Sequence, residues 1–183
     1  MGHTFDADKA SKLEDAASRY RYVSADELVG HADPAGKTVV DLGSGTGFYT
    51  DDVAAHAEYV YAIDLQEAMH EFYREKGVPE NVELVTSGVA DLPLADGAVD
   101  VAVSTMTYHE FANEESLAEV RRVLAPGGRL VVADWSADGA GDVGAPMHER
   151  YTPTEAADEL DAAGFTVSFE MGRPETFVLV AEN

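Results

Sequence analysis

The 183-residue sequence contains no cysteine and few basic residues. The missing thiols exclude disulfide bonds, thiolate metal sites and any mechanism that uses a cysteine nucleophile. Lysine and arginine total 12 against 35 aspartates and glutamates, which gives a formal net charge of −23. No basic run is present to neutralise phosphates over a broad surface, so nucleic acid is an unlikely partner.

Long hydrophobic runs are missing as well. The longest apolar stretches have the length of a strand, so the sequence predicts no membrane span, and nothing resembles a signal peptide. We therefore expect a cytoplasmic protein. The acidic excess in a chain that is 45% hydrophobic resembles that of halophilic proteins, in which salt screens repulsion between carboxylates, although it could equally be a solvated surface kept soluble by repulsion.

The most informative stretch is residues 39–48, which read VVDLGSGTGF. Two β-branched residues lead into Asp41, and glycines follow at positions 43, 45 and 47. Glycine permits positive φ and lets a ligand approach the bare backbone. A helix that begins near Tyr49 would add unpaired N–H donors. The stretch therefore predicts a strand, a tight turn and a helix around a nucleotide-type ligand.

The spacing of these glycines indicates which nucleotide. A dinucleotide fingerprint, G-x-G-x-x-G, would need glycine where Phe48 stands, so a nicotinamide oxidoreductase is disfavoured. Asp41 stands two residues before the first glycine. A carboxylate that close to the turn would repel a pyrophosphate, but it would not repel a cationic or amino-bearing ligand. The pattern Asp-x-Gly-x-Gly-x-Gly resembles the first motif of the class I S-adenosylmethionine-dependent methyltransferases.

Strand and helix signals alternate over the rest of the chain. Capping boxes at Ser24 and Thr152 predict helices that begin there. After the Gly-rich stretch, apolar runs predict six more strands, at residues 59–63, 82–86, 99–103, 129–135, 166–171 and 176–181. The last two are joined by a short connection, which makes them an antiparallel hairpin. The order predicts an α/β fold with a doubly wound, seven-stranded, mostly parallel sheet and a C-terminal antiparallel hairpin.

The order of these motifs resembles the class I methyltransferases over about residues 36–183, and LAPGGRLVVADW resembles the late strand of that family. Within the class, the chain looks most like the small-molecule group that includes ubiquinone and menaquinone C-methyltransferases. The resemblance implies a Rossmann-like methyltransferase fold in one domain, residues 1–183. Residues 36–183 would form the catalytic core, and residues 1–35 a helical segment that packs on the sheet or covers the site as a lid.

The resemblance also implies the cofactor S-adenosyl-L-methionine and its site. The backbone of the turn is expected to cradle the methionine moiety, with Asp41 orienting the turn and attracting the ammonium. Asp64, at the end of the second strand, is placed to accept both ribose hydroxyls. The turn residues are Gly43, Ser44, Gly45 and Gly47.

Five further positions complete the expected cofactor site. Leu65 would lie beside the adenine. Asp91 would accept the exocyclic amine of the adenine, and Leu92 would cover the ring. Ser104 and Thr105, at the end of the fourth strand, would contact the methionine end and face the methyl group.

Candidate acceptor residues follow the fourth strand. Tyr108 and His109 are the candidate catalytic residues, because this family commonly carries a histidine near the cofactor here. With an ordinary pKa of about 6.5, His109 could act as a general base if the acceptor must lose a proton, or it could pack structurally.

Two other histidine-containing segments add open alternatives. His148, with Glu149 and Arg150, could bind the acceptor or form a polar turn. His3, with Phe5 and Asp6, could come over the site as part of the lid. His3, His109 and His148 show no ligand spacing, so no metal site is predicted.

The sequence thus predicts methyl transfer from S-adenosylmethionine to a small-molecule acceptor. An RNA or protein methyltransferase is one alternative. The missing basic surface counts against RNA, and Ser-Thr-Met-Thr at 104–107 stands where amino-group methylators carry Asn-Pro-Pro-Tyr. The lack of cysteine argues against a resemblance to arsenite methyltransferases. A non-catalytic S-adenosylmethionine-binding protein is the other alternative, and it predicts binding without turnover.

Overall fold

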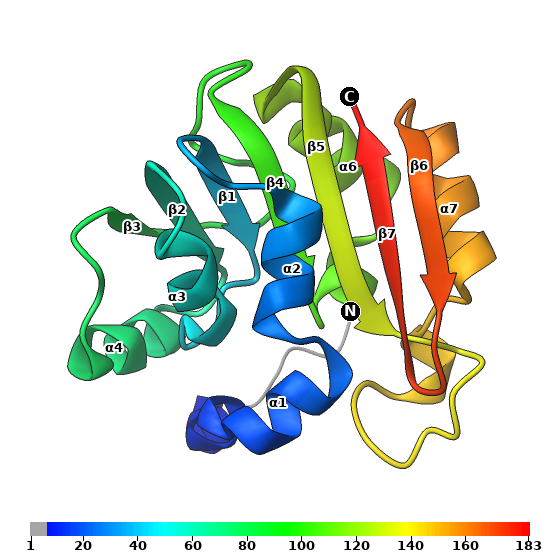
Figure 1. The fold of residues 1–183 in the computed structure, drawn as a ribbon, viewed down its shortest axis with the longest axis horizontal. Coiled ribbons are helices and arrows are strands. Elements are labelled where there is room, and N and C mark those ends of the chain that lie inside the picture. The colour runs from blue at the N-terminus through cyan, green and yellow to red at the C-terminus, as the bar shows by residue number, and fades with distance from the viewer. Residues whose placement is uncertain (1–6) are drawn as a thin grey trace.

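The computed structural model describes residues 7–183, which form one seven-stranded sheet between two layers of helices (Figure 1). The strand order is β3-β2-β1-β4-β5-β7-β6. The strands are β1 (Thr38–Leu42), β2 (Tyr59–Asp64), β3 (Val82–Thr86), β4 (Val99–Thr105), β5 (Leu124–Trp135), β6 (Thr166–Gly172) and β7 (Thr176–Glu182).

Strand pairing confirms the predicted fold. All neighbours among β1 to β5 run parallel, whereas β7 is antiparallel to both β5 and β6. The helices are the 3₁₀-helix η1 (Ala7–Glu14), α1 (Ala16–Tyr22), α2 (Ala25–Ala32), α3 (Phe48–Ala54), α4 (Glu67–Lys76), α5 (Tyr108–Phe111), α6 (Glu114–Val123), the 3₁₀-helix η2 (Met147–Glu149) and α7 (Pro153–Ala162).

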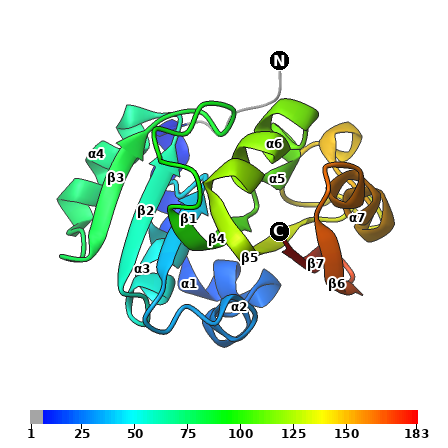
Figure 2. The ribbon, with the colours of Figure 1, turned by 90° about the horizontal axis from the view of Figure 1, so that it is seen from above.

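The sheet has a hydrophobic core on each face because side chains alternate along its strands. In β1, Val39 belongs to the core under α2 and α3, and Val40 to the core under α5, α6 and α7. Figure 2 shows these two groups of helices on opposite sides of the sheet. The parallel strands therefore end at one edge of a layered core, at the bottom of Figure 1, where α1 and the loop after β5 also lie.

Two elements differ from the prediction. β5 begins at Leu124 rather than at 129. Leu124 pairs with Val99, an irregularity follows that includes Gly128, and regular pairing resumes where Arg129 lies opposite Val101. The short helix α5 directly follows β4 and was not expected; four residues carry too little periodicity to show in a sequence. No helix in the described part of the chain is long and apolar enough to cross a membrane.

Gly47, the N-cap of α3, has a conformation and a neighbour that require glycine. Its φ is 80°, and a Cβ placed there would lie 2.1 Å from the ring of the fully buried Tyr73. The turn can therefore enter α3 only if this position lacks a side chain.

We expect Gly47→Ala to lower the free energy of unfolding by about 2–5 kcal/mol, from backbone strain and overpacking together. Gly30→Ala is the matched control, because Gly30 lies within α2 with nothing within 4 Å of its Cβ position, so alanine should stabilise by about 0.5–1 kcal/mol. Urea unfolding measures both. Equal shifts in the two variants would show that Tyr73 does not constrain Gly47.

Candidate functional site

A cavity of about 690 Å³ lies at the carboxyl ends of the parallel strands, under the N-terminal segment. One half is lined by the Gly-rich turn, the end of β2, residues 87–90, and three side chains of η1 and α1, namely Lys12, Leu13 and Arg19. The other half is lined by α5, the end of β5 and residues 143–146, with Tyr22 from α1. The two halves have different chemistry and are described in turn.

The Gly-rich turn is held by the end of β2. The N–H groups of Gly43 and Ser44 donate to the carbonyl of Ile63 at 2.9 and 2.8 Å, and Gly45 N–H donates to Asp64 Oδ2 at 2.8 Å. The other carboxylate oxygen of Asp64 accepts the N–H of Gln66 at 2.8 Å. Since a carboxylate oxygen has two lone pairs, Asp64 keeps capacity for a ligand's hydroxyls while it fixes the turn.

Asp41 lies behind the turn rather than in the cavity wall. It is 1% exposed, and its Oδ2 accepts the hydroxyl of Thr50 in α3 at 2.6 Å, while Oδ1 has no partner among the described residues. Burial raises the pKa of Asp41 to about 6, against the opposing effect of the Thr50 hydrogen bond. Asp41 therefore ties β1 to α3 and places a titratable carboxyl beneath the turn.

Several of the expected cofactor residues form the wall itself. Gly43, Ser44 and Gly45 line the cavity, together with Asp64, Leu65 and Thr105. Leu65 is 65% exposed, and Ser44 Oγ is buried without a partner in the described structure. Gly47 and Ser104 stay outside the wall, because Gly47 packs on Tyr73 and Ser104 is fully buried within β4.

The expectation for Asp91 and Leu92 needs correction, since neither residue lines the cavity. Leu92 is 3% exposed and belongs to the core under α6; its N–H donates to Glu119 Oε1 at 2.9 Å, and its carbonyl accepts from Arg122 at 3.0 Å. These bonds to α6 draw the segment away from the site. Residues 87–90 occupy that part of the wall instead.

Tyr108 also lies elsewhere than expected. Its side chain is fully buried and packs edge-on against Phe111 and Tyr151, with ring centroids 5.6 and 5.8 Å apart. Burial raises the pKa of its phenol. An aromatic ring at the first position of α5 points into the core, so we assign Tyr108 to packing rather than to catalysis.

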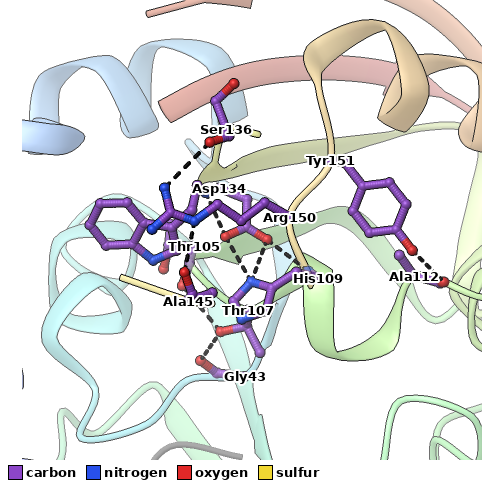
Figure 3. A network of polar contacts seen from close by, with 11 residues as sticks. Gly43, Thr105, Thr107, His109, Ala112, Asp134, Ser136, Ala145, Arg150 and Tyr151 are labelled. Atoms are coloured by element: carbon purple, nitrogen blue, oxygen red, sulfur yellow. Dashed lines mark hydrogen bonds and ion pairs between the residues drawn. The ribbon is translucent and has the colours of Figure 1, made fainter. Parts of the chain in front are cut away.

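His109 lines the second half of the cavity and is joined to the buried Asp134 at the end of β5 (Figure 3). The His109 backbone N–H donates to Asp134 Oδ2 at 2.7 Å, and its Nδ1 lies 2.9 and 3.0 Å from the two carboxylate oxygens. Burial lowers the pKa of His109, but the hydrogen bond and charge of Asp134 outweigh it, so the net pKa is raised. With Nδ1–H donated to Asp134, Nε2 is the basic nitrogen.

Comparison with known proteins identifies this arrangement. Residues 40–132, about half of the chain, match the sequence model of the family described as "Methyltransferase domain". A crystal structure of an S-adenosylmethionine-dependent methyltransferase from Aquifex aeolicus has 31% identity and a TM-score of 0.88, covering 98% of this chain and 99% of that one. The chain belongs to the S-adenosylmethionine-dependent methyltransferase family. The predicted family and cofactor are therefore confirmed.

Two further relatives have names that state their acceptors. Compared with the Aquifex aeolicus protein, one is aligned over less of its length and the other is less similar in sequence. A demethylmenaquinone methyltransferase from Corynebacterium kroppenstedtii is 34% identical over 81% of this chain and 60% of its own length. A 1,6-didemethyltoxoflavin-N1-methyltransferase from Burkholderia thailandensis has 26% identity and a TM-score of 0.72, covering 96% of this chain and 82% of that one. The chain spans 19–42% of the length of the first curated relatives that it matches.

The cavity fits the methionine end of the methyltransferase cofactor, which carries an ammonium and a carboxylate. Arg19 lines the roof, with its guanidinium 4.7 Å from the ring of Tyr49 and its Nε buried without a partner in the described structure. Burial lowers the pKa of Arg19. A buried guanidinium with a free donor suits a carboxylate, and the Asp41 carboxyl beneath the turn suits an ammonium.

The N-terminal segment of the methyltransferase is fastened over this half of the cavity by hydroxyl groups. The Tyr49 hydroxyl lies 2.9 Å from the carbonyls of both Arg19 and Val23, between which it shares its one proton, and the Tyr20 hydroxyl donates to Asp52 at 2.9 Å. Thr46 in the turn donates to Glu14. His3, Phe5 and Asp6, expected in the same lid, lie outside the described residues.

Asp134 is a candidate functional residue that the sequence did not indicate. The signal was an acid inside the apolar strand 129–135, because a buried carboxylate needs a partner to offset its lost hydration. His148, Glu149 and Arg150 line a smaller hollow that also touches His109. Among residues 7–183, no three histidine, aspartate or glutamate side chains converge as a metal site would require.

We expect Asp41→Asn to stabilise the ligand-free protein at pH 7 by about 1–3 kcal/mol, because a pKa raised from 3.8 to about 6 makes ionisation of Asp41 unfavourable to folding. The difference from the wild type should shrink as the pH falls below about 6 and vanish below about 3.8, where Asp41 is protonated in the folded and the unfolded chain alike. Cofactor affinity should fall, since the negative charge beneath the turn, which attracts the ammonium, is lost. Thermal unfolding across pH tests this; destabilisation by Asp41→Asn at pH 7 would contradict it.

We expect Asp134→Asn to lower the pKa of His109, as measured by NMR titration of the ring. Because folding raises this pKa, the pair stabilises fully below the unfolded value of about 6.5, and this contribution is lost as the pH rises through the folded value. The free energy of unfolding of the variant should therefore be about 3–5 kcal/mol lower than that of the wild type at low pH, and the difference should be smaller at high pH. Asp96→Asn, which breaks an exposed pair with Arg122, is the control and should cost at most about 1 kcal/mol. Equal losses at all pH values would contradict the assignment.

Proposed function

We propose that this chain transfers the methyl group of S-adenosylmethionine to a small-molecule acceptor whose proton is taken by His109. The observation that carries the proposal is that His109, which is paired with the buried Asp134, lies in the wall of a cavity whose opposite half is formed by the Gly-rich turn. The cofactor supplies the methyl group as an already activated sulfonium. The protein's own task is then to orient the two substrates and to manage one proton.

Binding of the cofactor is assigned to the half with the turn. The backbone at Gly43 and Gly45 and the hydroxyl of Ser44 would hold the methionine moiety, with Arg19 facing its carboxylate. Asp64 would accept the ribose hydroxyls, and Leu65 would pack beside the adenine. Residues 87–90 replace Asp91 and Leu92 as the wall on the adenine side.

Activation of the acceptor is assigned to the other half. Nε2 of neutral His109 would accept a proton from an acidic O–H, N–H or C–H group, and the buried Asp134 carboxylate would stabilise the imidazolium that forms. Tyr22, Phe111 and Trp135 provide aromatic surface around this end. A planar, weakly acidic acceptor fits both features, and the named acceptors of the quinone and toxoflavin relatives support a small molecule.

The N-terminal segment would act as a lid in this reaction. η1 and α1 contribute Lys12, Leu13, Arg19 and Tyr22 to the cavity wall, so they limit the access of water to both substrates. The aromatic, partly roofed cavity and the charge of −23 favour a small acceptor over RNA or a folded protein. A non-catalytic binder would leave the raised basicity of His109 without a use.

We expect S-adenosylmethionine and S-adenosylhomocysteine, but not NAD, to raise the melting temperature in concentrated salt. A ligand at 100 times its dissociation constant adds about 2.7 kcal/mol. Asp64→Ala should abolish the shift, whereas Glu83→Ala, on the exposed face of β3 outside the cavity, should keep it. A shift with NAD alone would overturn the cofactor assignment for this chain.

Turnover is the second arm of this test. With a panel of small phenols and enols as acceptors, His109→Gln should lower the rate by about 10²–10⁴-fold at unchanged S-adenosylhomocysteine affinity. The wild-type rate should rise with pH through the raised pKa of His109, because only the neutral imidazole accepts a proton. Binding without turnover on any acceptor would favour the non-catalytic alternative.

A further inference from the structure

Arg150 is a buried cation whose partners are main-chain carbonyls. Its side chain follows η2, and the residue is only 7% exposed. Nε donates to the carbonyl of Ala145 at 2.8 Å, Nη1 donates to that of Ser136 at 3.3 Å, and Nη2 donates to that of Val143. Figure 3 shows the guanidinium between Ser136 and Ala145. One side chain thus binds the loop after β5 at three points.

Two of these carbonyls belong to the 143–146 wall, the part of the loop that lines the cavity. Gly144 has a φ of 87°, and a Cβ there would lie 2.3 Å from the ring of Trp135. The backbone therefore lies against the indole, while the Arg150 guanidinium lies 5.6 Å from the centroid of the same ring. Contacts with Trp135 and Arg150 together therefore fix the position of the 143–146 wall.

The wall has few other restraints. Glycines occupy positions 139, 141 and 144, and Val143 is 43% exposed. Outside the contacts of Arg150, the N–H groups of Ala137 and Ala140 donate to the Tyr151 carbonyl at 2.8 Å and to Glu175 at 3.2 Å, and the Pro146 carbonyl accepts the N–H of Glu149 at 2.9 Å. A glycine-rich, exposed segment with few contacts opens at low free energy, and the hydrogen bonds to the Val143 and Ala145 carbonyls come from Arg150, so the guanidinium orders the part of the wall between them.

The chemistry of the contact requires arginine. A planar guanidinium presents several donors in a fixed fork, so it can reach three carbonyls at once and still stack on an indole. A lysine ammonium is a compact point charge on a flexible stem and cannot match this geometry. The position therefore depends on the shape of the side chain as much as on its charge.

We propose that Arg150 is a positioning residue that fixes the 143–146 wall against Trp135 and thereby determines which acceptors fit beside His109. The inference rests on the proposed function in one respect, since it takes this end of the cavity to hold the acceptor. Arg150 acts through the wall and does not itself touch the acceptor.

The single tryptophan of the chain provides a direct measurement, because Trp135 lies at the contact between Arg150 and the wall. In the ligand-free protein, Arg150→Lys should shift the Trp135 emission to longer wavelength and increase its quenching by acrylamide. Arg121→Lys is the matched control. Arg121 also donates to a carbonyl, that of Ala163, and its guanidinium lies 5.8 Å from the centroid of an aromatic ring, that of Phe165. It should leave the emission unchanged.

A second variant keeps the test decisive if Arg150→Lys fails to fold. Gly144→Ala retains Arg150 but forces the wall off the indole, so it should reproduce the change in emission. Unchanged emission in a folded Arg150→Lys or Gly144→Ala protein would overturn the proposal.

Kinetics separate this proposal from the proposed function. With a phenol that the wild type methylates, Arg150→Lys should raise the acceptor KM about tenfold, the order of one hydrogen bond to a charged group, with a smaller change in kcat and in S-adenosylhomocysteine affinity. For bulkier phenols, the acceptor KM should rise less than this or should fall. A raised KM with unchanged emission would mean that Arg150 binds the acceptor directly, which overturns the positioning role. Failure of the wild type to bind S-adenosylhomocysteine or to turn over would refute the proposed function, and the emission arm would still report on the wall.

Discussion

The hydrogen bonds between the Gly-rich turn and the end of β2 are the constraint on which the site depends. Ile63 and Asp64 together accept three consecutive N–H groups, from Gly43, Ser44 and Gly45, so the turn cannot move without the neighbouring strand. The same carboxylate also begins α4 by accepting the N–H of Gln66. A residue assigned to ribose recognition therefore also sets the shape of the turn, and under the proposed function both halves of the cofactor would be bound by one rigid unit. This coupling explains why the turn needs no side chain of its own to hold its conformation.

Charge is distributed unevenly over the molecule, and the cavity differs from the surface. In a chain with a net charge of −23, Lys12 and Arg19 both lie in the roof of the cavity. They come from the N-terminal segment, while the acids Asp41 and Asp64 lie in or beneath the floor. A zwitterionic ligand between them would have cations on one side, and on the other the Asp64 carboxylate with the Asp41 carboxyl behind it. High salt would screen the exposed carboxylates much more than these buried groups, so the fold could tolerate the acidic surface without loss of selectivity at the site.

Local signals allowed much of the fold to be predicted, and distant contacts account for the errors. The glycine spacing at 43–47 and the capping boxes at Ser24 and Thr152 act within a few residues, and both helices begin where those boxes indicate. Leu92 and Tyr108 could not be placed in this way, because their burial depends on packing against α6 and Tyr151. The His109–Asp134 pair joins residues 25 positions apart through the parallel pairing of β4 and β5, which a motif search cannot see.

Two buried acids show how the environment determines a role for the same side chain. Asp41 has one hydroxyl partner and an unpaired oxygen, so burial dominates and its pKa rises. Asp134 accepts the backbone N–H groups of His109 and Trp135 as well as the imidazole, so its charge is supported by fixed dipoles. A carboxyl of the first kind gains from a ligand that brings positive charge, and one of the second kind can hold a positive charge that forms during reaction. The fold thus buries one carboxyl behind each half of the cavity, and the two environments suit them to the different roles proposed above, binding for Asp41 and proton transfer for Asp134.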